Sequence, residues 1–148
     1  MSGYMNTAKS VEWETPRDLF DRLNEVWRFD LDVASSHANA LCESHYTAED
    51  DGLAQDWGGH RCWMNTPYGR VLADWVEKAY RESQKPGTIV VALIPARTDT
   101  RWFHEYVANG RSTEYTLLKG RLKFAIDGVP QQSATFPSML VRWGGRLE

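Results

Sequence analysis

The sequence predicts an α/β protein with a doubly wound, mostly parallel sheet and an antiparallel C-terminal hairpin. Short apolar runs alternate along the chain with segments of helical periodicity, as strands and helices do in such folds. Residues 88–94 form an almost unbroken apolar and β-branched run, which a strand covered on both faces requires. The last apolar runs, 121–126 and 139–143, are separated by an Asp-Gly pair and an irregular Pro-containing stretch, which indicates a hairpin.

The first half of the chain is expected to hold two helices and two strands. Apolar residues at helical spacing predict an amphipathic helix over 16–26, with Thr15 as N-cap and Pro16 at the first helical position. Alternating apolar residues predict a strand over 29–33, followed by a turn of small residues. The remaining expectations are a short helix over 37–43, a polar and mostly irregular stretch over 46–57, and a short strand over 61–64.

The second half is expected to continue the alternation of helix and strand. A helix over 71–83 ends before Pro86-Gly87, and Trp75 lies on its apolar face in a packing role. The later expectations are the strand over 88–94, a helix over 99–107 with Thr98 as N-cap, and a strand over 115–118.

Length and composition limit the class of protein. The 148 residues fit a single domain, residues 1–148, without a separate target-recognition domain, and 42% hydrophobic residues exclude global disorder. No run approaches the ~18 apolar residues of a membrane span. Residues 1–10 are polar, are expected to be flexible and carry no signal core, so the protein is expected in the cytoplasm. Two cysteines and four scattered histidines lack zinc-site spacing, so no metal is expected.

Charge is distributed unevenly along the chain. Residues 1–75 hold 13 acidic and 6 basic side chains, whereas residues 76–148 hold 7 acidic and 11 basic ones. An acidic lobe suits a cationic cofactor and a basic lobe suits a polyanionic substrate, although a solvated surface with chance asymmetry would look the same.

Residues 63–69, which follow an expected strand, carry the most specific chemistry. The side-chain oxygen of Asn65 and the backbone carbonyl of Thr66 can both accept hydrogen bonds from an exocyclic amine, and Pro67 restrains the backbone between them and Tyr68. The Tyr68 ring offers a flat face to a base removed from its stack. Such a site methylates an amine by alignment and electrostatics, without a covalent enzyme intermediate. An ordinary Asn-Pro turn is the competing interpretation.

The segment Asn65-Thr66-Pro67-Tyr68 resembles the Asn/Asp-Pro-Pro-Tyr signature of amino-group methyltransferases, with Thr66 in place of the first proline. Further short motifs follow in order, and the set resembles the Dam-like DNA N6-adenine methyltransferases of phages and prophages over residues 11–143. They are Trp13-Glu14-Thr15-Pro16, Asp30 to Ser35, Asn39-Ala40, Tyr46-Thr47, Asp51-Gly52-Leu53, Asp56-Trp57, Trp75-Val76, Leu93 to Arg97 and Gly120 to Phe124. The resemblance implies a Rossmann-like methyltransferase fold, S-adenosylmethionine as methyl donor, and a flipped adenine of duplex DNA as acceptor.

The resemblance also implies which residues bind the cofactor. They are Trp13, Thr15 and Pro16 near its methionine part, Asp32 with Ala34 and Ser35 after the first strand, and Asp51 with Leu53 at its adenine. Asp32 is alternatively a strand-end turn residue, and Asp51 part of an acidic surface turn. Glu49 and Asp50 adjoin Asp51 and can take its part, and Glu43, Asp50 and Asp56 are all candidates for the ribose. Ala34-Ser35-Ser36 stands where most such enzymes have a glycine-rich loop.

Arg97, Arg121 and Lys123 are the expected DNA contacts, and Phe124 is expected mainly to pack in the core. Two other functions remain open: methylation of amino groups in RNA or protein, and a catalytically degenerate module that binds DNA or a partner. Specificity is expected to come from short loops and the C-terminal hairpin, with the DNA sequence recognised and the oligomeric state left open.

Overall fold

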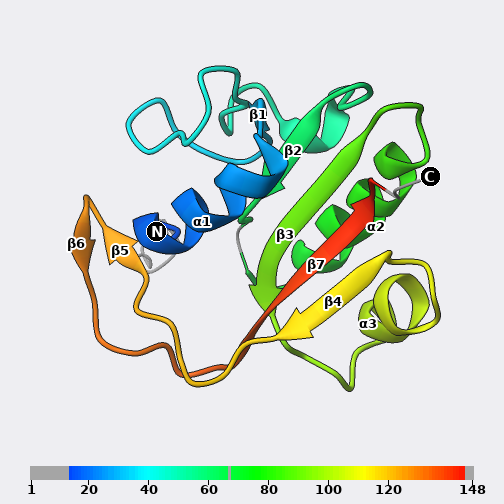
Figure 1. The fold of residues 1–148 in the computed structure, drawn as a ribbon. Helices are drawn as coiled ribbons and strands as arrows, with labels where there is room; N and C mark the ends of the chain where they lie inside the picture. The colour runs from blue at the N-terminus through cyan, green and yellow to red at the C-terminus, as the bar shows by residue number, and fades with distance from the viewer. Residues whose placement is uncertain (1–13, 67, 146–148) are drawn as a thin grey trace.

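The computed structural model describes residues 14–66 and 68–145, so the expected flexibility of residues 1–10 lies outside it. A five-stranded sheet of order β1-β2-β3-β7-β4 forms the centre of the molecule (Figure 1). Its strands are β1 (Leu31–Asp32), β2 (Arg61–Met64), β3 (Ile89–Pro95), β4 (Glu114–Leu117) and β7 (Ser138–Gly144). β1, β2 and β3 pair in parallel, and β7 runs antiparallel to both β3 and β4. β4 therefore points the same way as the first three strands, and the expected mostly parallel sheet is confirmed.

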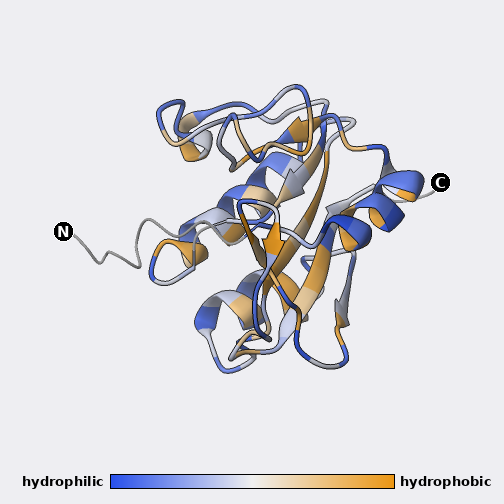
Figure 2. Cartoon of the chain, turned by 90° about the vertical axis from the view of Figure 1, so that its left-hand side faces the viewer, coloured by the Kyte–Doolittle hydropathy of each residue, from blue (hydrophilic) through white to orange (hydrophobic). Residues whose placement is uncertain are grey.

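Side chains of each strand point alternately to the two faces of the sheet. Both faces are apolar, and helices cover both of them. Trp63, Val91 and Leu93 pack on one face with Leu19 and Phe20 of α1 (Arg17–Trp27). The opposite face packs against α2 (Leu72–Ser83) and α3 (Arg101–Phe103), and it consists of Cys62, Met64, Val90, Ala92, Ile94, Met139, Val141 and Trp143. Figure 2 shows the apolar strands inside and polar helix surfaces outside.

The C-terminal hairpin differs from the expectation. Residues 139–143 belong to β7, which is inserted between β3 and β4 because Met139, Val141 and Trp143 are buried in the core there. A separate two-stranded sheet pairs β5 (Ala125–Ile126) with β6 (Val129–Pro130). The sequence predicted the Asp-Gly turn at the right place. Its two residues have positive φ angles of 52° and 79°, which the favoured two-residue hairpin turn requires at both positions.

The expected helix over 37–43 is wrong, since turns and bends occupy that segment. Side chains accept backbone N–H groups in and beside this segment, including that of Leu41, which such a helix would direct to the His37 carbonyl. Asn39 accepts from Ser36 at 2.8 Å, Ser36 from Asn39 at 3.2 Å, and Asp32 from Leu41 at 3.0 Å. Short polar side chains compete with helix formation in this way.

Two expected helix caps are also wrong. The helix after β3 is capped by Thr100, whose hydroxyl accepts the Phe103 N–H at 3.3 Å, while the carbonyl of Thr98 accepts from His104 at 2.8 Å. It continues as the π-helical turn η3 (His104–Ala108). Pro16 is the N-cap residue of α1 and has no side-chain cap, so the Thr15 hydroxyl serves elsewhere.

Candidate functional site

A cavity of about 1630 Å³ opens at the carboxyl ends of β1 and β2. Ligand sites of doubly wound sheets lie beyond the carboxyl ends of the strands. Cavities that hold one drug-sized molecule span roughly 300–1,000 Å³, so this one has room for two ligands side by side. Of the residues predicted for the site, those lining it are Thr15, Pro16, Asp32, Ala34, Ser35, Asp51, Asn65, Thr66, Tyr68, Arg121 and Lys123.

The carboxylate of Asp32 is nearly enclosed, with 3% of the residue exposed. Its two oxygens accept the backbone N–H groups of Ala34 at 3.3 Å and Leu41 at 3.0 Å. Burial raises its pKa to about 6, against the opposing effects of those two bonds and of nearby His45. In the described part of the chain no lysine or arginine forms an ion pair with it, so this buried anion favours a cation from outside the protein.

The carboxamide of Asn65 is held from two sides. Its Nδ2 donates to the Thr15 hydroxyl at 3.0 Å, and the Tyr68 hydroxyl lies 3.5 Å from its Oδ1. Burial keeps the pKa of Tyr68 well above its usual value, so this hydroxyl remains a donor. The site therefore presents an oriented amide at the end of β2.

An aromatic wall follows the amide. The Tyr68 ring meets Phe136 edge to face at 5.2 Å between centroids and Phe124 at 6.2 Å. Phe124 is buried and packs against these two partly buried rings, so its expected packing role is confirmed. A planar ring entering the cavity would meet a rigid apolar surface here.

The β5–β6 hairpin and the segment just before it form one rim of the cavity. Glu14 and Ala125 exchange backbone hydrogen bonds of 2.8 and 3.1 Å, and the Glu14 carboxylate accepts the N–H groups of Asp127 and Gly128. In Figure 1 the hairpin stands beside the start of α1. Arg121 and Lys123, both exposed, bring positive charge to this rim.

Comparison with known proteins adds the decisive observation. The family model described as "DNA N-6-adenine-methyltransferase (Dam)" matches residues 4–144. The chain belongs to this family. The DNA N-6-adenine-methyltransferase of Haemophilus phage HP1 (strain HP1c1) is 32% identical over 142 residues, which are 92% of this chain and 81% of the relative. That of Escherichia phage T1 is 34% identical over 127 residues, 83% of this chain and 52% of the relative. The putative methyltransferase YfdM of Escherichia coli (strain K12) is 43% identical over 47 residues, 31% of this chain and 52% of the relative.

The predicted resemblance to phage-type DNA N6-adenine methyltransferases is thus confirmed, and adenine N6 in DNA is the target of methylation in this family. None of the helices in the described ranges is long and apolar enough to cross a membrane. Within residues 14–66 and 68–145, no group of three or more His, Cys, Asp or Glu side chains is placed to hold a metal ion.

Some predicted site residues lie away from the cavity. Leu53 packs against the core, and Arg97 is exposed after β3 without lining the cavity. Asp56 pairs with Lys85 at 2.8 Å instead of lining the cavity. Trp13 and Pro67 fall outside the described residues. The carboxylates Glu43, Glu49 and Asp50 do not line the cavity either.

Other residues that line the cavity were not predicted for the site. Asp18 follows Pro16 in the first turn of α1, so its position next to a predicted residue was the available clue. Trp75 lines the cavity while stacking on Trp57 at 6.2 Å, so its predicted packing role is confirmed but incomplete. Val71, which directly precedes α2, is 43% exposed and also lines the cavity.

Gly52 lines the cavity at a position where no larger residue fits. A Cβ would overlap the Val33 carbonyl oxygen and approach the Trp75 ring to 3.0 Å. The Gly52 carbonyl also accepts the Trp57 indole N–H at 2.9 Å. The loop that carries Asp51 therefore packs closely against Val33, which follows β1, and against Trp75 of α2.

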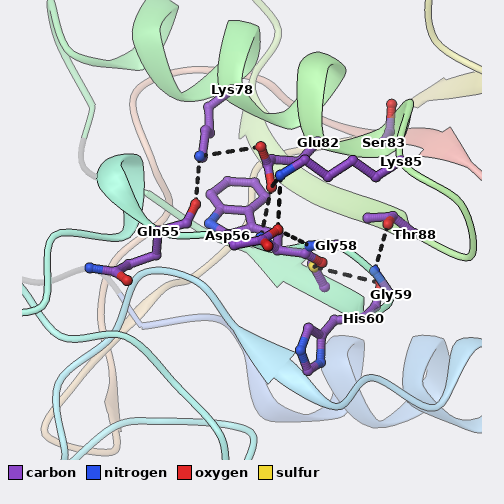
Figure 3. Close-up of polar contacts among 12 residues, drawn as sticks. Gln55, Asp56, Gly58, Gly59, His60, Lys78, Glu82, Ser83, Lys85 and Thr88 are labelled. Atoms are coloured by element: carbon purple, nitrogen blue, oxygen red, sulfur yellow. Dashed lines mark hydrogen bonds and ion pairs between the residues drawn. The ribbon is translucent and has the colours of Figure 1, made fainter.

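A polar network of residues that do not line the cavity fixes the same loop (Figure 3). Glu82 of α2 accepts the buried Trp57 backbone N–H at 2.7 Å and pairs with Lys85 at 2.9 Å and Lys78 at 3.3 Å. Burial alone would raise the pKa of Glu82, but the hydrogen bonds from Lys85 and Trp57 hold it below its usual value. Lys78 also donates to the Gln55 carbonyl and lies over the Trp57 ring. This network therefore helps to hold the loop in place.

Proposed function

We propose that this protein transfers a methyl group from S-adenosylmethionine to N6 of adenine in DNA, in the cytoplasm of a phage or prophage host. The observation that carries the proposal is the cavity that unites a buried carboxylate, Asp32, with an oriented amide, Asn65, in a chain of this family. The sheet with one reversed strand next to its edge agrees with a Rossmann-like methyltransferase fold.

The residues on the β1 side of the cavity fit the cofactor. Asp32 offers a buried negative charge to its ammonium group or sulfonium. Ser35 lines the same wall, and its hydroxyl is buried without a hydrogen-bond partner among the described residues. The start of α1, at Pro16, offers a helix N-terminus to a carboxylate. When bound, S-adenosylmethionine supplies an electrophilic methyl group.

The residues that follow β2 fit the acceptor. The lone pair of adenine N6 is delocalised into the ring, so the amine becomes a better nucleophile when its N–H groups are engaged by acceptors. Asn65 Oδ1 supplies one acceptor, and the Thr66 carbonyl supplies the second. Both residues line the cavity, and Thr66 is buried. The amide and carbonyl also stabilise the positive charge that develops on N6 during transfer.

The aromatic wall and the basic rim fit DNA. Tyr68, backed by Phe124 and Phe136, provides an apolar face for a base that has left its stack. Arg121 and Lys123 would contact backbone phosphates on the same side as the hairpin. Arg97 is assigned a phosphate contact outside the cavity, on the exposed turn after β3.

Methyl transfer with labelled S-adenosylmethionine tests the proposal. Equal amounts of unmethylated duplex DNA, RNA of the same sequence and an unrelated protein serve as acceptors, and calorimetry measures cofactor binding. Label in DNA alone supports the proposal. Label in RNA alone or in protein alone would show that the labelled molecule, and not DNA, is the substrate. Binding of DNA without binding of the cofactor would identify a degenerate binding module, which the turn of Ala34, Ser35 and Ser36 in place of glycines makes the second candidate.

A further inference from the structure

The hydroxyl of Thr15 contacts the amide that the proposed reaction needs. The Thr15 Oγ1 accepts a hydrogen bond of 3.0 Å from Asn65 Nδ2, across 50 residues of sequence. Thr15 is 8% exposed and lines the cavity together with Asn65. Since Pro16 is the N-cap residue of α1, this hydroxyl does not cap the helix.

The direction of the Asn65 amide decides whether it can serve an amine. Its oxygen accepts an N–H group of the substrate, whereas the amide turned by half a revolution would oppose one N–H with another. Two contacts of opposite polarity fix the useful direction. Thr15 accepts from the nitrogen end, and the Tyr68 hydroxyl lies 3.5 Å from the oxygen end.

Thr15 is itself held firmly by its neighbours in the chain. Glu14 forms two backbone hydrogen bonds with Ala125, and its carboxylate binds the turn of the β5–β6 hairpin. Pro16 leads directly into α1. The hydroxyl therefore has a fixed place from which it can orient a side chain on β2.

We propose that Thr15 is a positioning residue, which orients the Asn65 carboxamide so that Oδ1 faces the N6 amine of the target adenine. This inference rests on the proposed function. It assigns Thr15 to the substrate side of the cavity, in addition to the cofactor side that the sequence resemblance implies.

Thr15→Val and Thr15→Ser test the inference, with Thr116→Val on the exposed strand β4 as a matched control. Valine keeps the shape but removes the acceptor, so we expect kcat to fall about tenfold, as the loss of one oriented hydrogen bond predicts. The Kd of the cofactor and the KM for DNA should stay within about threefold. Serine should restore kcat, and the control should match the wild type. A higher cofactor Kd with unchanged kcat in Thr15→Val would overturn the inference.

A second readout is independent of catalysis. The side-chain N–H resonances of Asn65, assigned by their loss in Asn65→Ala, should exchange slowly with solvent in the wild type and in Thr15→Ser. They should exchange faster in Thr15→Val. Fast exchange in the wild type would overturn the inference even if Thr15→Val did not fold. A wild type that methylates no DNA but shows the protected amide would refute the proposed function and leave the contact between Thr15 and Asn65 established.

Discussion

Replacing Asp32 with Asn should remove the pH dependence of cofactor binding. The pKa of Asp32 is about 6 because the carboxyl is buried. At about pH 7.5 roughly 97% of the molecules then carry the charged form, and at about pH 5 roughly 10% do. If the cationic cofactor binds only the charged form, its apparent Kd should be about tenfold higher at about pH 5, which corresponds to about 1.4 kcal/mol.

Calorimetric titration of S-adenosylmethionine at several pH values measures this effect. The wild type should lose affinity as the pH falls through 6, while Asp32→Asn should bind weakly and equally at all values. Asp74→Asn, an exposed carboxylate in the first turn of α2, is the control and should follow the wild type. Equal wild-type affinity at both ends of the range would refute the reasoning.

The same carboxyl predicts an unusual dependence of stability on pH. Its pKa rises on folding from 3.8 to about 6, so the folded state disfavours the charged form by about 3 kcal/mol. This cost is fully present above pH 6 and is relieved as the pH falls toward 3.8. Asp32→Asn removes the charge but loses one acceptor, worth about 1 kcal/mol, so we expect a net gain of about 1–2 kcal/mol in the free energy of unfolding at neutral pH. Urea unfolding checks it, and a destabilised variant would contradict it.

Four further substitutions follow from the geometry of the site and its surroundings. Gly52→Ala should lower the free energy of unfolding by about 1–3 kcal/mol and weaken cofactor binding, because the added Cβ overlaps the Val33 carbonyl oxygen. Urea unfolding measures the first effect and calorimetry the second. Unchanged values would show that the neighbouring backbone can move aside. Glu82→Ala should lower the free energy of unfolding by about 2–3 kcal/mol, since it leaves the buried Trp57 N–H without its acceptor and removes one partner each from Lys78 and Lys85; thermal unfolding checks this, and a change below about 0.5 kcal/mol would refute it. Arg121→Ala and Lys123→Ala should each weaken DNA binding about equally for all sequences and reduce the salt slope by about 1, as fluorescence anisotropy would show; an unchanged slope would argue against phosphate contacts.

The local patterns in the sequence predicted the elements whose burial is periodic. The helices around Phe20 and Trp75 have a strong apolar face, and residues 88–94 are apolar on both sides of a strand, so their structure follows from local spacing. The position of β7 in the sheet does not follow from local spacing. Its apolar residues suit either a hairpin or the middle of a sheet, and only long-range packing of Trp143 and its neighbours decides between them.

In the candidate site too, local patterns predicted some features, whereas others depend on long-range contacts. Asn65, Thr66 and Tyr68 were predicted from the chemistry of a short motif, and the structure brings them into one cavity with Asp32. The contact between Thr15 and Asn65 joins residues 50 positions apart, and no local pattern indicates it. The sequence also suggested a simple N-cap at Thr15, because that interpretation needs only neighbouring residues.

The identity of the methylated nucleoside tests the central claim most directly. Unmethylated duplex DNA is incubated with the protein and S-adenosylmethionine, digested to nucleosides and analysed by mass spectrometry, with Asn65→Ala in parallel. We expect N6-methyldeoxyadenosine from the wild type and a decrease of about 10²–10³-fold in the variant, since one electrostatic contact to the reacting amine is lost. Methylation of cytosine alone, or undiminished adenine methylation by Asn65→Ala, would contradict the account.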